Sequence, residues 1–461
     1  MRRAFLLSLL LASAMTPADA QTPASAAAKL TYPDTERDGV VDTQFGIVVS
    51  DPYRWLENDV RRDARVRDWV TAENRVTDAY LATLPGRDLF RRRMIELFDY
   101  ERYGLPVRKG SRYFYTHNSG LQNQSPLYVR ESLDGPERLL IDPNGWAKDG
   151  ANALADWQPS DDGAHVAYAV QEGGSDWRTI HVLDVVTGQL LPDHVDWVKF
   201  SGLDWADDGS GFYYSRFPTP ADGAKFQAVN ENQAVYYHRL GTPQADDRLI
   251  YATPDRPKLN HGARVSDDGR WLVVTSSEGT DDRYEVTLVD LKDAQAKPRT
   301  LIPGLVNNWS YIGNRGAIFY FATNAGAPRL RIVTIDVSQP DPKAKVIVEE
   351  DLATLDGAAL VGDTLMLDYL VDARSEVRRY GLDGRKMGKV DLPGIGSAAG
   401  FRGEPGSSET FFAFTSFARP STIYRYDADK GKATVWAAPR VSFNPEDYRV
   451  EQQFFFSRDG T

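Results

Sequence analysis

The chain contains serine, histidine and carboxylate side chains, the residue types that catalyse hydrolysis, but their spacing specifies no catalytic site. A nucleophilic serine set on a sharp strand-to-helix elbow requires a Gly-x-Ser-x-Gly motif, and the sequence contains none. The nearest string is GIGSAAG at residues 394–400, where Ile395 takes the first small position and strand-like sequence follows. We therefore predict no catalytic residue within the chain.

Metal and cofactor sites lack support in the same way. The histidines show no i, i+4 pair of the kind that binds zinc on a helix. They are His117, His165, His181, His194, His238 and His261. Residues 204–209 suggest a calcium loop, but Ala206 stands where an oxygen ligand is needed. The glycine clusters lack the strand-loop-helix context of a phosphate site. We predict no metal and no cofactor.

Paired carboxylates such as Asp281 and Asp282 fall in predicted turns. An acid and base pair for glycoside hydrolysis could be placed among such residues, but no spacing rule identifies it. A metal-dependent or glycosidic enzyme is therefore only a distant alternative.

The secondary-structure elements that must position these side chains are marked by a turn sequence that occurs four times. The copies are Ser160-Asp-Asp-Gly163, Ala206-Asp-Asp-Gly209, Ser266-Asp-Asp-Gly269 and Ser457-Arg-Asp-Gly460. Asp side chains hydrogen-bond to their own backbone and Gly accepts positive φ, so each copy predicts a tight reversal between two strands.

Strand-like sequence runs from Pro106 to about Trp436. Seven short β-branched or aromatic segments each follow a glycine, and these glycines recur every 44–60 residues at Gly110, Gly163, Gly209, Gly269, Gly316, Gly362 and Gly406. A four-stranded propeller blade has roughly 40–50 residues. The fold class predicted is therefore all-β, a seven-bladed β-propeller. A β-sandwich is the alternative, but it would not need one hairpin at near-constant intervals.

Helical sequence precedes the strands. After Asp51, apolar residues recur at three- and four-residue steps up to Pro85-Gly86, which predicts an amphipathic helix whose stripe packs on another surface. They are Val66, Trp69, Val70, Val76, Tyr80, Leu81 and Leu84. A second, shorter helix is predicted around residues 89–97.

The N-terminus has the pattern of an export signal. Arg2 and Arg3 precede an apolar stretch that is too short for a membrane anchor, and Ala18-Asp-Ala20 resembles a cleavage site. We expect a periplasmic or secreted protein that is not held in a membrane. Whether export is of the general or the twin-arginine type stays open.

The composition restricts the partners. The formal net charge of −11 argues against nucleic acid, whose phosphates need a basic face. The chain has no cysteine, so neither a disulfide nor a thiol catalyst is available. We expect a monomer.

Several strings resemble the prolyl oligopeptidase (prolyl endopeptidase) family. They are DPYRWLE at 51–57, SGLQNQ at 119–124, GSDWRTI at 174–180, KFSGLDWADDGSGFYY at 199–214, QAVYYHRLG at 233–241, and FTSF at 414–417 with Pro420. The resemblance covers almost all of the chain after the signal segment.

This resemblance implies an exported serine peptidase that cleaves short peptides after proline. In that family a propeller gates access to a split α/β-hydrolase domain that carries a Ser, Asp and His triad. Here the triad would lie beyond Thr461, so this chain alone is predicted inactive. The missing hydrolase domain and short proline-containing peptides are the expected partners.

The resemblance also implies substrate-facing residues on the propeller rim. Family positions before the second-blade and fourth-blade turns and in the fourth-blade hairpin fall on Pro159, Asn260 and Thr280, and nearby Trp157 could substitute for an aromatic residue that the family carries. The family has aromatic and soft apolar residues at these positions, so this chain departs from its pattern.

The expected domains follow from these assignments. Residues 1–20 form the signal peptide, 21–31 a disordered leader, 32–103 the N-terminal helical part of the split hydrolase domain, 104–440 the propeller, and 441–461 the start of the returning hydrolase strand. Two alternatives stay open: an oligopeptidase of the same superfamily that cuts after Lys or Arg, and a free-standing propeller that binds peptide or protein.

Overall fold

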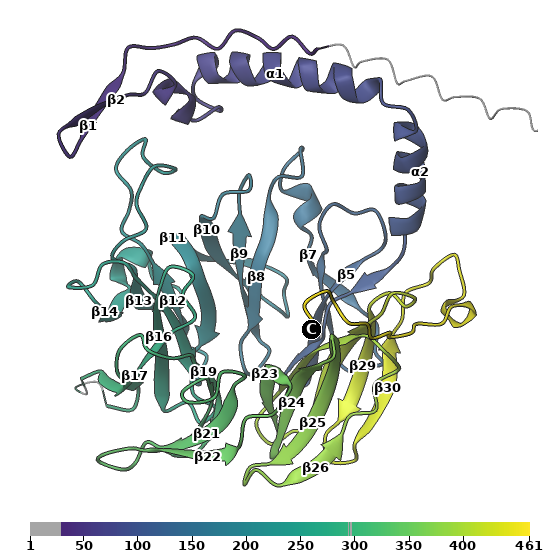
Figure 1. Cartoon of the computed structure of the whole chain (residues 1–461). Coiled ribbons are helices and arrows are strands. Elements are labelled where there is room, and N and C mark those ends of the chain that lie inside the picture. Colours follow the sequence, from purple (N-terminus) through teal and green to yellow (C-terminus); the bar gives the residue numbers. More distant parts are fainter. Residues whose placement is uncertain (1–28, 294, 296) are drawn as a thin grey trace, which may run out of the picture. The chain divides into compact units, whose positions relative to one another are not determined.

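The computed structural model describes residues 29–293, 295 and 297–461. The expected signal peptide, residues 1–20, and most of the expected leader, residues 21–31, lie outside the described residues. The chain forms two compact units, with the boundary between Arg91 and Arg92 (Figure 1).

The first unit contains a hairpin and one long helix. Strands β1 (Val41–Gln44) and β2 (Ile47–Ser50) form the hairpin, which is followed by the 3-10 turn η1 (Arg54–Glu57) and helix α1 (Ala64–Ala82). The Asp63 carboxylate caps α1 by accepting from the backbone N–H of Arg65 and Val66, as expected at a helix N-terminus.

The start of α1 packs on the extended segment before the hairpin. Trp55 is buried, its ring meets that of Trp69 edge to face at 6.4 Å, and its indole N–H donates to the Glu36 carbonyl. Arg65 stacks on Trp55 and pairs with Asp38 at 2.8 Å. Of the predicted apolar stripe of α1, only Val66 is buried.

Helix α2 (Arg87–Phe98) crosses the boundary between the two units. None of its residues is buried, and six large apolar side chains are between 42% and 69% exposed. These are Leu89, Phe90, Met94, Ile95, Leu97 and Phe98.

The second unit is built almost entirely of antiparallel sheets (Figure 1). A five-stranded sheet contains β3 (Arg102–Tyr103), β4 (Val107–Lys109), β5 (Arg112–Asn118), β6 (Leu127–Arg130) and β7 (Arg138–Ile141). A seven-stranded sheet contains β8 (Ala153–Pro159), β9 (His165–Gln171), β10 (Arg178–Asp184), β11 (Leu190–Trp205), β12 (Gly211–Arg216), β13 (Ala234–Arg239) and β14 (Arg248–Ala252).

Four further sheets have four strands each. The first two are β15 (Leu259–Val265), β16 (Trp271–Glu278), β17 (Glu285–Asp290) and β18 (Arg299–Ile302), then β19 (Trp309–Arg315), β20 (Ile318–Thr323), β21 (Arg331–Asp336) and β22 (Ala344–Val348). The last two are β23 (Thr354–Val361), β24 (Thr364–Val371), β25 (Arg374–Gly381) and β26 (Lys386–Lys389), then β27 (Ser397–Gly403), β28 (Glu409–Thr415), β29 (Thr422–Asp427) and β30 (Lys432–Ala437). Short 3-10 turns are η2 (Pro143–Gly145), η3 (Gln244–Asp246) and η4 (Pro445–Asp447).

This arrangement corrects the predicted fold class. Among the described residues, five sheets have the size of one blade, whereas residues 153–252, expected to hold two blades, form one continuous sheet. The prediction of seven separate blades is therefore wrong, although the unit is an all-β propeller. The cause is the 16-residue strand β11, which pairs with β10 through Val195 and Ile180 and with β12 through Leu203 and Tyr214.

The repeated turn forms as the sequence predicts. Gly163, Gly209 and Gly269 have φ between 65° and 69°, and each donates its N–H to the carbonyl three residues earlier at 2.8 Å. These copies join β8 to β9, β11 to β12 and β15 to β16. The fourth copy closes with a 3.1 Å bond from Gly460 to Ser457, but the described chain has no strand within residues 441–461.

The last sheet of the unit lies beside the first one. The Lys109 ammonium, on β4, contacts Asp161 at 2.6 Å and Glu404, after β27, at 3.1 Å. The Tyr113 hydroxyl on β5 donates to Glu409 on β28, and the Tyr113 ring packs on Phe411. These contacts join sequence-distant ends of the unit (Figure 1).

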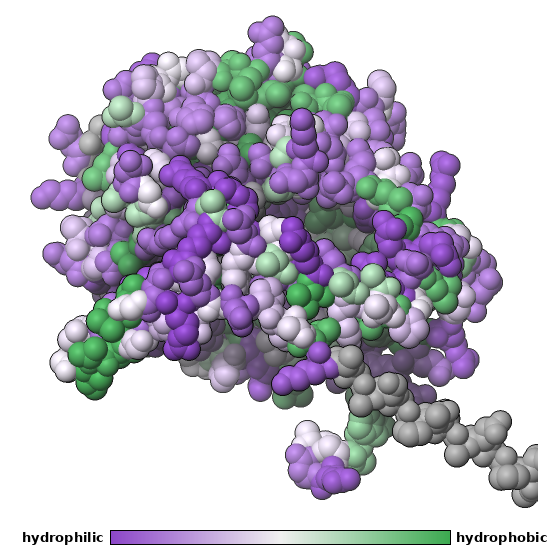
Figure 2. Space-filling view, turned by 90° about the horizontal axis from the view of Figure 1, so that it is seen from above, coloured by the Kyte–Doolittle hydropathy of each residue, from purple (hydrophilic) through white to green (hydrophobic). Residues whose placement is uncertain are grey.

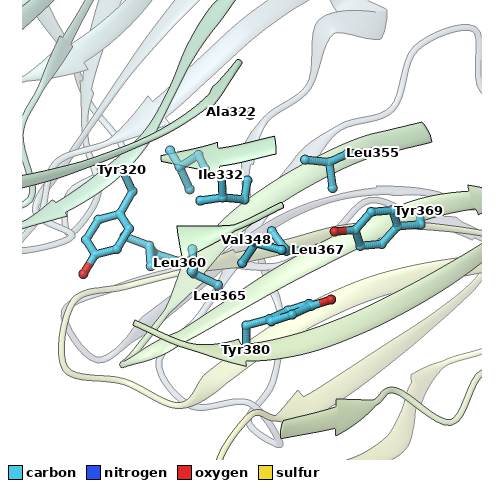
Figure 3. Close-up of a cluster of buried hydrophobic side chains, with 11 residues drawn as sticks. Tyr320, Ala322, Ile332, Val348, Leu355, Leu360, Leu365, Leu367, Tyr369 and Tyr380 are labelled. Carbon is cyan, nitrogen blue, oxygen red and sulfur yellow. The ribbon is translucent and has the colours of Figure 1, made fainter. Parts of the chain in front are cut away.

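Burial of apolar side chains between neighbouring sheets holds the unit together. Figure 3 shows one such cluster, in which Tyr320 and Ile332 of the β19–β22 sheet face Leu360, Leu365 and other residues of the β23–β26 sheet. Full burial of an aliphatic or aromatic side chain contributes about 1.5–3 kcal/mol to the stability of the folded state. The described unit has no disulfide that could add to this stability.

Polar residues cover most of the face drawn in Figure 2, where hydrophobic residues gather in separate patches. Within residues 29–293, 295 and 297–461, no helix combines the length and the apolar composition that a membrane crossing needs.

Candidate functional site

A pocket of about 770 Å³ opens where the seven-stranded sheet meets the β15–β18 sheet. Its lining comes from Phe200 on β11, from residues 229–231 in the loop between β12 and β13, and from the end of the β15–β16 hairpin that lies away from the Ser266–Gly269 turn. Strands β11 and β15 are neighbours across this junction.

One buried glutamine fixes the two walls of the pocket to each other. The Gln233 side-chain amide donates to the Lys199 carbonyl at 2.8 Å, and its oxygen accepts from the backbone N–H of His261 at 2.5 Å. Gln233 is 1% exposed. The bond to Lys199 supports Phe200 at φ 53°, a conformation that is uncommon for a bulky residue.

His261 forms the floor of the pocket and is structural rather than basic. Its ring lies between the hydroxyls of Ser276, 2.8 Å from Nδ1, and Thr253, 3.1 Å from Nε2. Burial, together with the positive charge of Arg256, lowers the pKa of His261 to about 4.

The Ser276 and His261 pair has the distance of a nucleophile and its base, but it cannot act as one. Both side chains are completely buried, and the second ring nitrogen meets a hydroxyl, not the carboxylate that orients a catalytic histidine. The neutral ring can only fix the strand positions around it.

Asn260 places an unsatisfied group in the lining. It pairs with Ser277 across the hairpin, and its side-chain oxygen is buried without a hydrogen-bond partner in the described structure. A buried acceptor without a donor costs about 1–3 kcal/mol, and because solvent cannot reach this oxygen, the cost falls on the fold itself.

Charged and apolar groups complete the pocket. Glu231, Glu278 and Lys258 supply the charges, and Phe200 and Tyr284 supply aromatic surface. Concave sites that combine apolar walls with a few polar groups are typical of ligand binding. The arrangement can bind a peptide-sized group, and its described lining holds no exposed nucleophile paired with a base.

The structure brings together two of the four predicted rim residues. Asn260 and Thr280 both line the pocket, whereas Trp157 and Pro159 do not. Pro159 ends β8 directly before its turn, while Asn260 lies near the start of β15, six residues before the equivalent turn. Trp157 packs partly buried against the core between the first two sheets.

Sequence reasoning missed several lining residues. Phe200 lies inside the string at 199–214 that carries the family resemblance, so that string could have identified it. Glu231, Lys258 and Tyr284 stand in irregular segments without a motif, and no sequence signal marks them.

Metal binding has no geometric support in the part of the chain that the structure describes. No group of three or more histidine or carboxylate side chains there is placed to hold an ion.

Comparison with known proteins assigns a family to this fold. Residues 32–439 match the family described as prolyl oligopeptidase, N-terminal beta-propeller domain. A prolyl endopeptidase of Elizabethkingia miricola is 36% identical over 436 residues, which are 94% of this chain and 60% of that protein. A prolyl oligopeptidase of Omphalotus olearius is 29% identical over 470 residues, 93% of this chain and 63% of that protein.

Solved structures give the same result. One from a structural and mechanistic study of two prolyl endopeptidases is 44% identical, with a TM-score of 0.74, over 93% of this chain and 62% of that one. Prolyl oligopeptidase B from Galerina marginata, bound to a 35mer hydrolysis and macrocyclization substrate, is 26% identical with a TM-score of 0.81, over 94% and 64%. This chain therefore spans 60–63% of the length of the two curated relatives named above.

Proposed function

The chain belongs to the prolyl oligopeptidase family, and from this premise we propose that it is the N-terminal and propeller portion of a serine peptidase that cleaves short peptides after proline. The observation that carries the proposal is the match of nearly the whole chain to prolyl endopeptidases. The pocket at the junction of β11 and β15 adds a peptide-sized site that has no catalytic pair of its own.

In this proposal the propeller controls access, and a hydrolase portion supplies the Ser, Asp and His triad. Folded proteins are excluded by size, and short peptides reach a site whose dry walls strengthen electrostatic interactions. Asn260 and Thr280 contact the peptide in the pocket.

Exposed apolar residues support a hydrolase partner. The apolar side chains of α2 and the run Phe454-Phe455-Phe456, 76–88% exposed, are candidates to pack on it. Apolar patches of this kind mark interaction sites in soluble proteins. The proposal also includes export, on the basis of the N-terminal signal pattern, and a monomeric state.

Peptidase assays test the proposal. The product of the full open reading frame should cleave a short reporter peptide after proline, should spare the same peptide with alanine in place of proline, and should spare a folded protein that carries the sequence in a loop. Residues 1–461 alone should be inactive.

Two results would contradict specific parts of the proposal. Cleavage after lysine or arginine instead of proline would favour the related oligopeptidase. Turnover by residues 1–461 alone, abolished by a serine-directed inhibitor, would show that the chain carries its own nucleophile.

A further inference from the structure

Gln233 lies behind the wall of the pocket, and we propose that it is a positioning residue that sets which peptides the pocket prefers. Its side chain holds Phe200 in a left-handed backbone conformation, and the Phe200 ring then receives an apolar side chain of the peptide. Gln233 is 1% exposed and does not line the pocket itself. The inference rests on the proposed function, because the ligand is a peptide that the propeller admits.

The backbone of Phe200 is the first reason. Its φ is 53°, and that of Trp197, three residues earlier on β11, is 62°. The left-handed region is sterically disfavoured for residues with a Cβ atom, and bulky residues persist there only where the surrounding structure fixes them. Such residues gather at ligand-binding sites, so two of them on one strand beside a pocket indicate a role in binding.

A comparison within the chain shows that core packing does not account for this conformation. Phe401 on β27 has a φ of 62°, but it is 3% exposed and its ring stacks on Phe412 at 4.8 Å. Burial therefore offsets the steric cost at Phe401. Phe200 is 49% exposed and lines the pocket, so its conformation presents apolar surface instead of burying it.

The hydrogen bonds of Gln233 are the second reason. Its amide nitrogen donates to the carbonyl of Lys199 at 2.8 Å and, more weakly, to that of Phe200 at 3.4 Å. These two carbonyls flank the Phe200 Cα atom, so the bonds restrain both of its backbone angles. The amide oxygen accepts from the His261 N–H of the facing sheet. Since a backbone N–H can only donate, this contact also settles which end of the amide faces Lys199.

The surroundings of the Phe200 ring are the third reason. The Lys199 ammonium lies 5.2 Å from the centre of this ring and 5.1 Å from that of Trp177. A cation therefore already occupies an aromatic face here, and a second cation from a ligand would be repelled by it. Val229, which is 74% exposed, adds apolar surface to the same lining. A neutral apolar side chain is the group that fits this part of the pocket.

Calorimetry with the 461-residue chain tests the inference. The peptides contain proline, are acetylated and amidated, and carry leucine or alanine at each position before the proline in turn. Because the Phe200 ring supplies apolar surface, one leucine peptide should bind at least about ten-fold tighter than its alanine counterpart, the factor expected when the additional carbon atoms of leucine are half buried.

Variants separate a positioning role from a merely structural one. Phe200→Ala should abolish the leucine preference, and Gln233→Met, which keeps the length of the side chain but removes its amide, should reduce it. In the Phe200→Ala background, Gln233→Met should change the affinity for neither peptide, because Gln233 acts through Phe200. Gln233→Glu should keep the preference at pH 5, where burial keeps the carboxyl neutral and the neutral group can both donate to Lys199 and accept from His261.

Gln244→Met is the matched control. Gln244 also bonds to the backbone of β11, since it accepts from the Asp196 N–H and donates to the Asp196 carbonyl, each at 3.0 Å, but it does not line the pocket. This variant should weaken the fold and leave the leucine preference unchanged. Circular dichroism shows which variants are folded, and Phe200→Ala, which changes a half-exposed side chain, keeps the test decisive if Gln233→Met does not fold.

Equal binding of the leucine and alanine peptides by the unaltered chain would overturn the inference, and so would an absence of binding by every peptide. A preserved preference in Phe200→Ala or in folded Gln233→Met, or an equal loss in Gln244→Met, would overturn it as well. So would equal losses in Gln233→Glu at pH 5 and Gln233→Met, since the hydrogen bonds would then be irrelevant. None of these results bears on cleavage after proline by the product of the full open reading frame, so the proposed function fails or stands separately.

Discussion

Replacement of His238 should destabilise the propeller more than replacement of any exposed histidine. His238, on β13, is completely buried between two carboxylates, with Asp247 2.7 Å from Nδ1 and Asp193 3.0 Å from Nε2. Asp193 also accepts from the Gly241 N–H, and Asp247 from the Tyr214 hydroxyl. The histidine therefore links β11, β13 and the segment before β14.

The size of the destabilisation follows from the two buried carboxylates that lose their partner. His238→Gln removes the cation that compensates two buried carboxylates, together with two hydrogen bonds to charged groups. Such bonds contribute about 1.5–3 kcal/mol each, and removal of one partner of a buried ion pair costs about 3–5 kcal/mol. We therefore expect the free energy of unfolding to fall by about 3–5 kcal/mol.

The effect should depend on pH. Burial by itself lowers the pKa of His238, but the hydrogen bonds and charges of Asp247 and Asp193 outweigh it, so the pKa lies above its ordinary value of 6.5. A raised pKa means that the stabilisation is complete below about pH 6.5 and is lost as the pH rises through the folded-state pKa. Asp247→Asn removes one anionic partner and lowers the folded-state pKa of His238, so the loss should be smaller and complete at a lower pH.

Urea denaturation followed by the fluorescence of the ten tryptophans, at pH 5.5, 7 and 9, measures these changes. The matched control is His194→Gln, because His194 also pairs with an aspartate, Asp196 at 3.0 Å, but is 55% exposed. That variant should change the free energy of unfolding by less than about 0.5 kcal/mol. A loss below about 1 kcal/mol for His238→Gln, or equal losses for the two variants, would refute the reasoning.

Two further predictions concern the turn ends of the sheets. Gly163→Ala should lower the free energy of unfolding by at least about 1 kcal/mol more than Gly209→Ala. Both residues have positive φ, which costs a residue with a side chain about 1–2 kcal/mol, but only at Gly163 would the new methyl group lie 2.7 Å from a backbone oxygen, that of Lys109. Equal thermal shifts for the two variants would contradict this prediction. Burial raises the pKa of Asp204 to about 6, so its ionised form is penalised in the folded state above that pH and not below about pH 4. Asp204→Asn, which keeps an acceptor for the Val265 N–H, should stabilise the protein by about 1–3 kcal/mol at pH 8 and leave it unchanged at pH 4; the same gain at both pH values would exclude the ionisation.

The sequence predicted the parts of the fold that depend on local chemistry. Each Asp-Asp-Gly turn forms because its residues need only their own backbone, and the helices before the strands follow from apolar spacing and the Asp63 cap. The number of separate blades depends instead on whether one strand pairs on both edges. Strand β11 does so through a register shift between Val198 and Leu203, which no composition or period reveals.

The family resemblance placed substrate-facing residues by their position in a blade, and only some of these positions meet at the pocket. Asn260 and Thr280 were identified by position in the hairpin, and both line the pocket. Pro159 was placed by the same analogy, but it lies at the end of strand β8, whereas Asn260 lies near the beginning of β15. The two residues therefore lie at opposite ends of their strands. The loop that carries Glu231 has no periodic pattern, so its approach to β15 depends on tertiary contacts such as that of Gln233.

The two ends of the propeller strands have different roles, and this difference indicates where residues that select peptides can lie. At the turn end, side chains are committed to neighbouring sheets: Lys109 contacts Asp161 and Glu404, and Arg315 contacts Asp267 at 2.9 Å. A substitution there changes the assembly of the sheets. At the opposite end, the irregular segments around residues 229–231 and 278–280 line a pocket that includes Glu231 and Glu278. Loops on a rigid scaffold tolerate change, so altered peptide preference should map to this end, while altered stability maps to the turns.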